Sequence, residues 1–362
     1  MGRGPRFRRA RGLVVHWAAN GLVCVDCLKG RRIRVTPEVV RFLDGLEEWT
    51  TVTALAKRPG MKAPHAEIER HIRRLARLGL IETGTTPASP WAAWMPEAAF
   101  FHFGTRARTF AADPRDQDVQ LRAKARDDPP PASTKHSPGK RRSLPQPVAL
   151  GAMSDCLLAR RTWRNFEPAP LPLPDIATLL QLTWGVQQRG AVKGLGSVVL
   201  KTSPSAGARH PVEAYLLALR VQDLPAGAYH YDADSHELVD LRRRMTPARL
   251  QRLIGNQDYY RDAAAVIIMT AVVARSMWKY PRSRAYRAML LDAGHLGQTF
   301  CLAATALGLA PFCTMAFAES PLERLLRVDG VSECAIYAVG VGTRATGYET
   351  KPGRIPPRKG TP

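Results

Sequence analysis

Lys279 and Tyr280 place two proton-transferring side chains next to each other, inside the basic and aromatic stretch RSMWKYPRSRAYR at residues 275–287. An unperturbed tyrosine titrates near pH ~10 and a lysine near ~10.4, so neither is a good base at neutral pH. A neighbouring cation lowers a tyrosine pKa and burial lowers a lysine pKa, so both residues are candidate bases. Alternatively, both simply pack or face solvent where the apolar run at residues 263–274 ends as a strand.

A second chemically capable group is formed by Arg160, Arg161, Thr162 and Arg164. Guanidinium groups are planar donors that bind oxygen atoms in pairs, and together with a hydroxyl they suit a phosphate. The group lies at the junction of two predicted helices, residues 153–161 and 173–186, and such connections often hold ligands. Alternatively, these residues are simply a run of charged side chains exposed to solvent.

A third feature is the small-residue turn formed by Pro204, Ser205, Ala206 and Gly207. A turn of this kind allows backbone N–H groups to approach a planar or anionic ligand closely, although most such strings are plain turns.

Metal chemistry is not expected. Cys24 and Cys27 form a CxxC without a second pair, and the histidines show no ligand spacing.

The elements that position these residues alternate between helix and strand from about 149 to 345, which predicts an α+β domain. Within it, Met289, Ala293, Leu296 and Phe300 recur at helical spacing and predict a long helix. A neighbouring face of this helix carries small residues. It is expected to admit another backbone at a domain core or subunit interface.

The N-terminal region is predicted to be a separate, smaller α+β unit. Residues 12–85 show three short strands, then a helix that begins with Thr36 as N-cap and Pro37 as its first residue. A second helical run, residues 66–82, ends like the recognition helix of a winged helix-turn-helix. Residues 87–112 are rich in aromatics and proline, and the polar residues 113–148 predict a linker or disorder.

The net charge of +22 indicates a polyanionic partner, unless arginine-rich coding bias has scattered the cations over a solvated surface. No apolar run is long enough to span a membrane, and the N-terminus is a poor signal peptide. Six dispersed cysteines, mostly in apolar contexts, are typical of a reduced cytoplasmic protein. A membrane partner is therefore not expected.

The order of the motifs is more specific than any one of them. RRTWRNF, SPSAGARHPVEAY, GAYHYD, WKYPRSRAYR, LDAGHLGQTFCLAATALGLAP and ECAIYAVGVG follow one another between about 150 and 345. This order resembles the SagB-type (ThcOx) dehydrogenases of the FMN-dependent nitroreductase superfamily. The N-terminal unit resembles the PqqD-like winged-helix element that binds leader peptides. The implied domains are 1–86 for peptide recognition, 87–148 as aromatic segment and linker, 149–346 as the FMN domain, and 347–362 as a basic tail.

The resemblance implies a nitroreductase-like fold, with a mixed or antiparallel central sheet flanked by helices, in a homodimer that binds FMN between its subunits. The FMN contacts that it implies are Arg160, Arg161, Thr162, Arg164, Pro204, Ser205, Ala206, Gly207, Gly308, Leu309 and Arg344.

Lys279 and Tyr280 correspond to a catalytic pair in family members that oxidise azolines. The expected reaction converts a thiazoline or oxazoline of a modified precursor peptide into the azole, with loss of a proton and a hydride. A cyclodehydratase is an expected partner. Two alternatives stay open: an NAD(P)H-dependent nitroreductase-like enzyme or other peptide oxidase, and a nucleic-acid-binding winged-helix protein.

Overall fold

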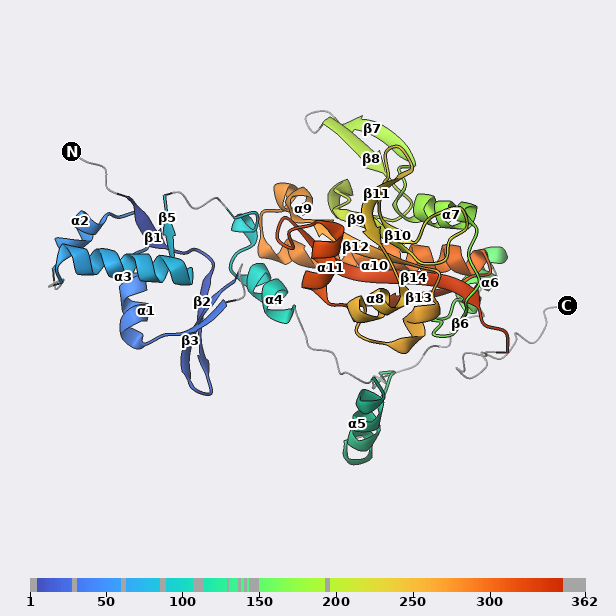
Figure 1. Cartoon of the computed structure of the whole chain (residues 1–362), viewed down its shortest axis with the longest axis horizontal. Coiled ribbons are helices and arrows are strands. Elements are labelled where there is room, and N and C mark those ends of the chain that lie inside the picture. The colour runs from blue at the N-terminus through green and yellow to red at the C-terminus, as the bar shows by residue number, and fades with distance from the viewer. Residues whose placement is uncertain are drawn as a thin grey trace. The chain divides into compact units, whose positions relative to one another are not determined.

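The chain forms two compact units, which are described separately (Figure 1). The computed structural model describes residues 5–27, 31–59, 63–84, 89–106, 114–128, 130–135, 138–139, 142, 150–192 and 196–347. The first unit comprises residues 1–106 with 273–288, and the second comprises residues 107–272 with 289–362. Residues 273–288, which include Lys279 and Tyr280, are therefore grouped with the N-terminal region. The predicted domain boundaries stay predictions, and nearly all of the basic tail lies outside the described residues.

The first unit begins with a small sheet and a group of helices. The sheet has the order β2–β3–β4 and is antiparallel; it is followed by α1, α2 and α3, after which β5 pairs antiparallel with β1. Their bounds are β1 Phe7–Arg9, β2 Leu13–Ala18, β3 Gly21–Asp26, β4 Arg31–Arg34, α1 Pro37–Asp44, α2 Val52–Ala56, α3 His65–Leu78 and β5 Ile81–Thr83.

Local sequence signals explain these helices. α1 begins at Pro37 after Thr36, as predicted, although the Thr36 side chain makes no capping hydrogen bond. α3 ends where Gly79 takes the left-handed conformation at φ 81°, which glycine adopts without strain. Ile68, Ile72 and Leu75 of α3 pack into one buried cluster with β1, β3, α1 and α2. The three predicted strands are confirmed, and the winged-helix assignment stays a prediction.

The first unit is completed by an aromatic segment and the residues that follow β12. These elements are η1 Ala92–Trp94, α4 Glu97–Thr105, α9 Val273–Lys279 and η4 Ser283–Ala285. The structure differs from one expectation here. The apolar run at 263–274 does not end as a strand beside Lys279, because the chain turns directly into α9 at Val273 and Lys279 is its last residue.

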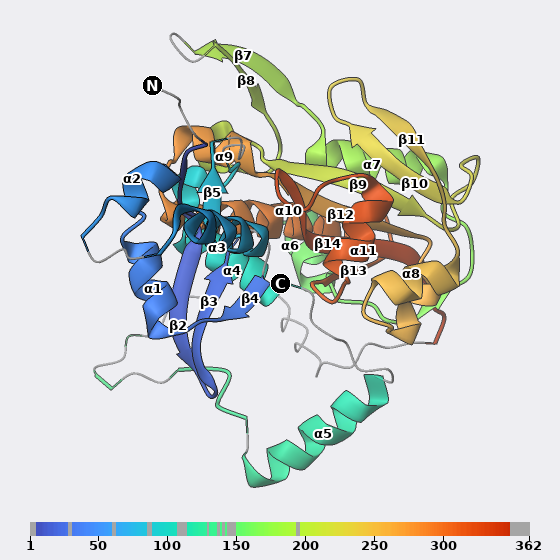
Figure 2. The ribbon, with the colours of Figure 1, turned by 60° about the vertical axis from the view of Figure 1, so that its left-hand side comes forward.

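The second unit is built on an antiparallel sheet of order β11–β10–β9–β12–β14–β13, with β6 paired to the end of β14. A separate hairpin, β7–β8, projects from it (Figure 2). The bounds are β6 Phe166–Glu167, β7 Gln188–Val192, β8 Gly196–Leu200, β9 Val212–Ala218, β10 Gly227–Asp232, β11 Glu237–Arg244, β12 Ala265–Val272, β13 Ala310–Thr314 and β14 Glu333–Arg344. The predicted α+β class with an antiparallel sheet is confirmed.

Helices pack on both faces of this sheet. On one face, α8 and α11 contribute leucines to a buried cluster with β9, β12 and β14. On the other, Phe300 of α10 packs against Trp184 of α7, and Gly297 of α10 faces the Tyr337 ring of β14. The bounds are α6 Ala152–Ala159, α7 Leu173–Trp184, η2 Ala206–Ala208, α8 Pro247–Leu253, η3 Asp258–Asp262, α10 Tyr286–Ala306 and α11 Glu319–Leu326.

One helix was not expected from the sequence. Residues 113–148 predict a linker or disorder, whereas Pro114–Asp127 forms α5. Its later residues are good helix formers, including alanine, lysine, arginine and glutamine, which accounts for the conformation. Every side chain described on α5 is exposed, so local propensity alone supports it. Across the described ranges, none of the helices combines the length and apolar character needed to cross a membrane.

Candidate functional site

The small-residue turn before β9 is held in place by an acid of α10. Ser205 Oγ donates a hydrogen bond to Asp292 Oδ2 at 2.6 Å, and the Ala206 N–H donates to Asp292 Oδ1 at 3.2 Å. Ser205 Oγ also accepts from the His210 N–H at 2.9 Å. Asp292 is only 4% exposed, so its carboxylate relies on these donors. The Asp292 carboxylate therefore fixes the conformation of the turn.

Further contacts bind the same turn to α10. Ser203 Oγ lies 2.7 Å from Thr299 Oγ1, and His295 Nδ1 lies 3.2 Å from the Pro204 carbonyl oxygen. Gly207 has a φ of 62°, which favours glycine. The cavity behind the turn measures about 10 Å³, enough for one water molecule at most. The turn is thus well packed against α10, and a ligand would have to meet its other side.

The arginine segment follows α6 and leads into β6. Arg161 Nη1 donates to the carbonyls of Leu158 and Arg160 at 2.7 and 2.8 Å. The side chain of this residue, which was predicted to bind phosphate, therefore caps the C-terminal end of α6. Thr162 and Arg164 are exposed. The Trp163 N–H donates to the Pro311 carbonyl at 2.9 Å, which ties the segment to β13.

Arg344 connects this segment with the C-terminal end of α10. Its Nε donates to the Leu309 carbonyl at 3.1 Å and its Nη2 to the Thr305 carbonyl at 3.4 Å. A cation there is favoured, because the last carbonyls of a helix carry partial negative charge. The Arg344 guanidinium also lies 5.4 Å from the centre of the Trp163 ring. The structure therefore gathers the arginine segment, Leu309 and Arg344 at one place.

The two groups of predicted FMN contacts are anchored at different positions of α10. The turn is fixed to Asp292, whereas Arg344 binds the carbonyl of Thr305, more than three turns further along α10. At 1.5 Å per residue these positions are about 20 Å apart. The two groups are therefore anchored at points of α10 that differ by more than three turns.

Lys279 and Tyr280 lie at the end of α9. Lys279 is exposed and Tyr280 is half-buried, with Lys279 Nζ 5.8 Å from the centre of the Tyr280 ring. The Tyr280 N–H donates to the Ser276 carbonyl at 3.0 Å. Its own carbonyl oxygen accepts from Trp94 Nε1 and from the Arg282 N–H, each at 2.8 Å. The backbone of the pair is thus held at several points.

A pair of thiols lies between α10 and β13. Cys301 Sγ and Cys313 Sγ are 3.3 Å apart, with Arg160 close enough to act on both. Hydrogen bonds from Cys301 and Tyr337 lower the pKa of Cys313 to about 7, whereas Cys313 and burial raise that of Cys301. Of the two thiols, Cys313 is therefore the one that loses its proton more readily.

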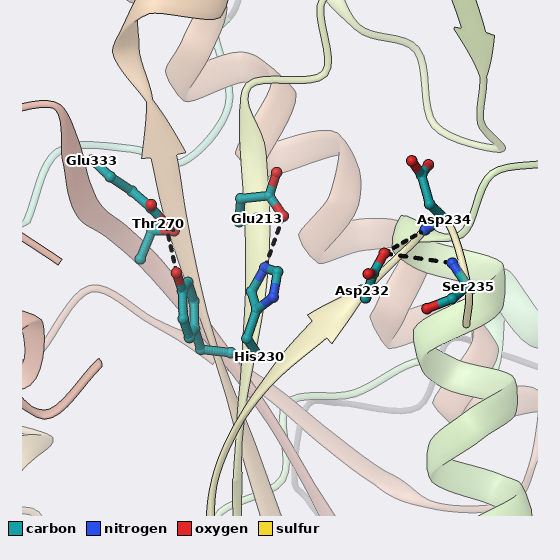
Figure 3. Close-up of polar contacts among 8 residues, drawn as sticks. Glu213, His230, Asp232, Asp234, Ser235, Thr270 and Glu333 are labelled. Atoms are coloured by element: carbon teal, nitrogen blue, oxygen red, sulfur yellow. Dashed lines mark hydrogen bonds and ion pairs between the residues drawn. The ribbon is translucent and has the colours of Figure 1, made fainter. Parts of the chain in front are cut away.

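A polar cluster occupies one end of the central sheet (Figure 3). His230 Nε2 of β10 points toward a Glu213 carboxylate oxygen of β9 at 3.2 Å. Glu333, at the start of β14, accepts hydrogen bonds from Tyr215 and Thr270. The hydrogen bond to Glu213 is the main cause that raises the pKa of His230, and Glu333 adds to it through its charge. The two carboxylates therefore favour the protonated form of His230.

Asp292 and Trp94 are the structurally important residues that motif reasoning missed. Asp292 carried a signal, because it is an acid on a helix whose neighbours are largely apolar. The only sequence signal for Trp94 was its place in an aromatic segment. The Tyr280 carbonyl that it binds lies 186 positions away, so local pattern does not reveal the contact.

Comparisons with known proteins agree with the fold. The model of the nitroreductase family matches residues 157–343, just over half of the chain. A protein of Methanocaldococcus jannaschii, provisionally named a nitroreductase, is 29% identical over 49% of this chain and 84% of its own. The trifolitoxin-processing protein TfxB of Rhizobium leguminosarum bv. trifolii is 33% identical over 48% of each chain, so this chain spans about half of that relative's length.

A similar solved structure belongs to the E. coli microcin synthetase McbBCD complex with truncated pro-MccB17 bound. It is 19% identical with a TM-score of 0.46, over 64% of this chain and 94% of that one. The family match extends from the end of α6 into β14, and it includes the arginine segment, the turn and α10. This chain therefore belongs to the nitroreductase family.

Proposed function

We propose that this protein is an FMN-dependent dehydrogenase that oxidises a thiazoline or oxazoline of a ribosomally made peptide to the thiazole or oxazole. The observation that carries the proposal is the Lys279–Tyr280 pair at the exposed end of α9, in a chain of the nitroreductase family. The relative TfxB is named a trifolitoxin-processing protein, and this name supports the proposal that this chain also has a processing role.

The residues present fit FMN. Thr162 and Arg164 are exposed donors suited to a phosphate, with Arg160 beside them. Gly308 has a φ of 73°, and a Cβ built on it would meet no atom within 4 Å, so a planar ring can approach its backbone. Leu309 and the turn at 204–207 complete the set. Because Arg344 is engaged with carbonyls of α10, we assign it to shaping the site.

We propose a homodimer, because the two groups of contacts are anchored at Asp292 and Thr305, about 20 Å apart along α10. In such a dimer the arginine segment of one protomer and the turn of its partner would complete one site. α6 supports this arrangement, because Met153, Leu157 and Leu158 expose 57, 45 and 51% of their surface. An apolar helix face of this kind is typical of a subunit contact.

The chemistry requires a base and a two-electron acceptor. Bound FMN supplies the acceptor for the hydride. Lys279 and Tyr280 offer an amine and a phenol next to each other for the proton on the ring carbon beside the carbonyl. Lys279 is exposed, so a proton taken up by the pair can pass to water.

The N-terminal region supplies a candidate peptide site. A groove of about 590 Å³ has Arg8, Arg9, Arg11, Asp44 and Glu47 among its lining residues, and Arg9 forms an ion pair with Asp44 at 3.3 Å. We propose that residues 1–86 bind the leader of the precursor peptide there, and that a cyclodehydratase forms the azoline beforehand. Six free thiols suit the reducing cytoplasm as the place of action.

The first test is the visible spectrum of the purified protein, with mass measurement of any released cofactor. A flavin spectrum and released FMN are expected; a colourless protein that does not bind added FMN refutes the proposal. The second test follows a synthetic peptide with one thiazoline and seeks a loss of two hydrogen atoms. Lys279→Ala and Tyr280→Phe should keep FMN and lose turnover.

A nitroreductase activity is the second candidate, favoured by the family itself. Rapid anaerobic bleaching of the flavin by NAD(P)H, without oxidation of the thiazoline peptide, would select it. Salt-sensitive binding of duplex DNA, without flavin, would instead select a nucleic-acid-binding role for the cationic chain.

A further inference from the structure

The aromatic segment at residues 89–106 lies upstream of the region that the nitroreductase family model matches. Its elements η1 and α4 both contact η4, which follows the Lys279–Tyr280 pair directly in the chain. Trp91 and Trp94 have no exposed surface, and Ala99 has none either. Burial of two whole indole rings indicates a packed structural element rather than a connecting linker.

Three hydrogen bonds join this segment to the residues that follow Lys279. Trp94 Nε1 donates to the Tyr280 carbonyl at 2.8 Å, and Ser283 Oγ donates to a Glu97 carboxylate oxygen at 2.6 Å. His102 Nδ1 and the Tyr286 hydroxyl lie 2.9 Å apart. The partners in the second segment are spaced three residues apart, so the contacts fix the whole stretch from 280 to 286.

Ring packing fixes the far end of the stretch. The Tyr286 ring lies 5.9 Å from the ring of Trp91, 6.2 Å from that of Trp94 and 6.2 Å from that of Phe101, measured between centroids. Tyr286 is 8% exposed. Because burial lowers the pKa of His102 to about 3, His102 stays neutral at physiological pH and the cluster carries no buried charge.

The Lys279–Tyr280 pair needs such external support. α9 has seven residues, too few for a stable isolated helix, and Lys279 itself is exposed. Proton-transfer groups must be held within about 0.5 Å of the productive geometry. The only side-chain hydrogen bond that the described structure gives to the Tyr280 backbone comes from Trp94.

We propose that residues 89–106 are a positioning element for the Lys279–Tyr280 pair, with Trp94 as its central positioning residue. The inference rests on the proposed function, in which this pair handles the substrate proton. Trp94 acts through the Tyr280 backbone, Glu97 through Ser283, and His102 through Tyr286. The nitroreductase domain thus takes the geometry of its catalytic pair from a segment outside the matched family region.

The test uses Trp94→Phe, which keeps an aromatic ring and removes the N–H donor. Loss of one buried hydrogen bond should raise amide hydrogen exchange in residues 279–287 about tenfold. Exchange in β12 should stay unchanged. Trp49→Phe is the matched control in the same unit, and it should leave exchange in 279–287 at the wild-type rate. Equal exchange in Trp94→Phe and wild type overturns the proposal.

Glu97→Ala and Glu97→Gln provide a second pair that does not threaten folding, because Glu97 is exposed. The amide oxygen of glutamine still accepts from Ser283. Faster exchange in Glu97→Ala than in Glu97→Gln is therefore expected, and equal exchange in the two counts against the proposal.

Kinetics with the thiazoline peptide separate this inference from the proposed function. Trp94→Phe should lower kcat about tenfold with KM and bound FMN unchanged, and it should not lower further the residual rate of a Tyr280→Phe background. A full additional loss in the double variant overturns the positioning role. Wild-type turnover by both Lys279→Ala and Tyr280→Phe refutes the catalytic pair, while the exchange result still decides whether Trp94 holds the segment.

Discussion

Replacing Asp292 by alanine should release the turn at 203–207 and weaken flavin binding. The Asp292 carboxylate accepts from the Ser205 hydroxyl at 2.6 Å and from the Ala206 N–H at 3.2 Å, and it is 4% exposed. Asp292→Ala therefore leaves two donors without this acceptor inside a packed region. Asp292→Asn keeps one acceptor oxygen and should be milder.

The expected magnitudes follow from these contacts. An unsatisfied buried donor costs about 1–3 kcal/mol, so two donors together should lower the free energy of unfolding by about 3 kcal/mol in Asp292→Ala. Asp292→Asn exchanges a charged acceptor for a neutral one and should cost about 1 kcal/mol. For a unit of this size, a loss of about 3 kcal/mol lowers Tm by roughly 9 °C.

The assay is denaturant unfolding, combined with the FMN content of the purified variants from the flavin absorbance. Glu237→Ala serves as the control, because it removes an exposed carboxylate from β11. It should change stability by no more than about 0.5 kcal/mol. An Asp292→Ala protein that unfolds at the wild-type midpoint would refute the anchoring role. A destabilised variant with full FMN content would separate the turn from the cofactor site.

Three further predictions follow from other contacts. His230 has a raised pKa in the folded protein, so its ion pair with Glu213 should stabilise the fold fully below about pH 6.5 and progressively less as pH rises through the folded pKa. His230→Gln should therefore lower the free energy of unfolding by about 1 kcal/mol at pH 5.5 and by less at pH 9. A loss of stability that does not depend on pH would contradict this prediction. Cys313 has a pKa lowered to about 7, so its alkylation by iodoacetamide, followed by peptide mass, should reach half its maximal rate near that pH rather than near ~8.5. A Cβ on Gly340 would lie 2.2 Å from Phe312 Cζ, so Gly340→Ala should cost about 2 kcal/mol in thermal unfolding, whereas Gly294→Ala, whose Cβ meets nothing within 4 Å, should be neutral or stabilising.

The secondary structure was predictable where the signal is local. Residues 265–271 of β12 are buried because almost every side chain there is apolar, and α3 ends at Gly79 because glycine accepts a left-handed φ. Prediction failed at the end of this strand, where the apolar run continues but the backbone changes from strand to helix. The apolar run continues into Val273, yet the chain becomes helical there, so Lys279 ends a helix instead of a strand.

The sequence by itself determined the α+β class, the helix α7, the long helix α10 and the candidate residues, because side-chain type and spacing are local properties. Only the tertiary structure decided how these residues are held. Asp292 meets Ser205 across 87 positions and Trp94 meets Tyr280 across 186. It also anchored the two groups of predicted FMN contacts at Asp292 and Thr305, about 20 Å apart along α10. Such contacts depend on which surfaces the packed helices and sheet bring together, and no periodicity in the chain encodes that choice.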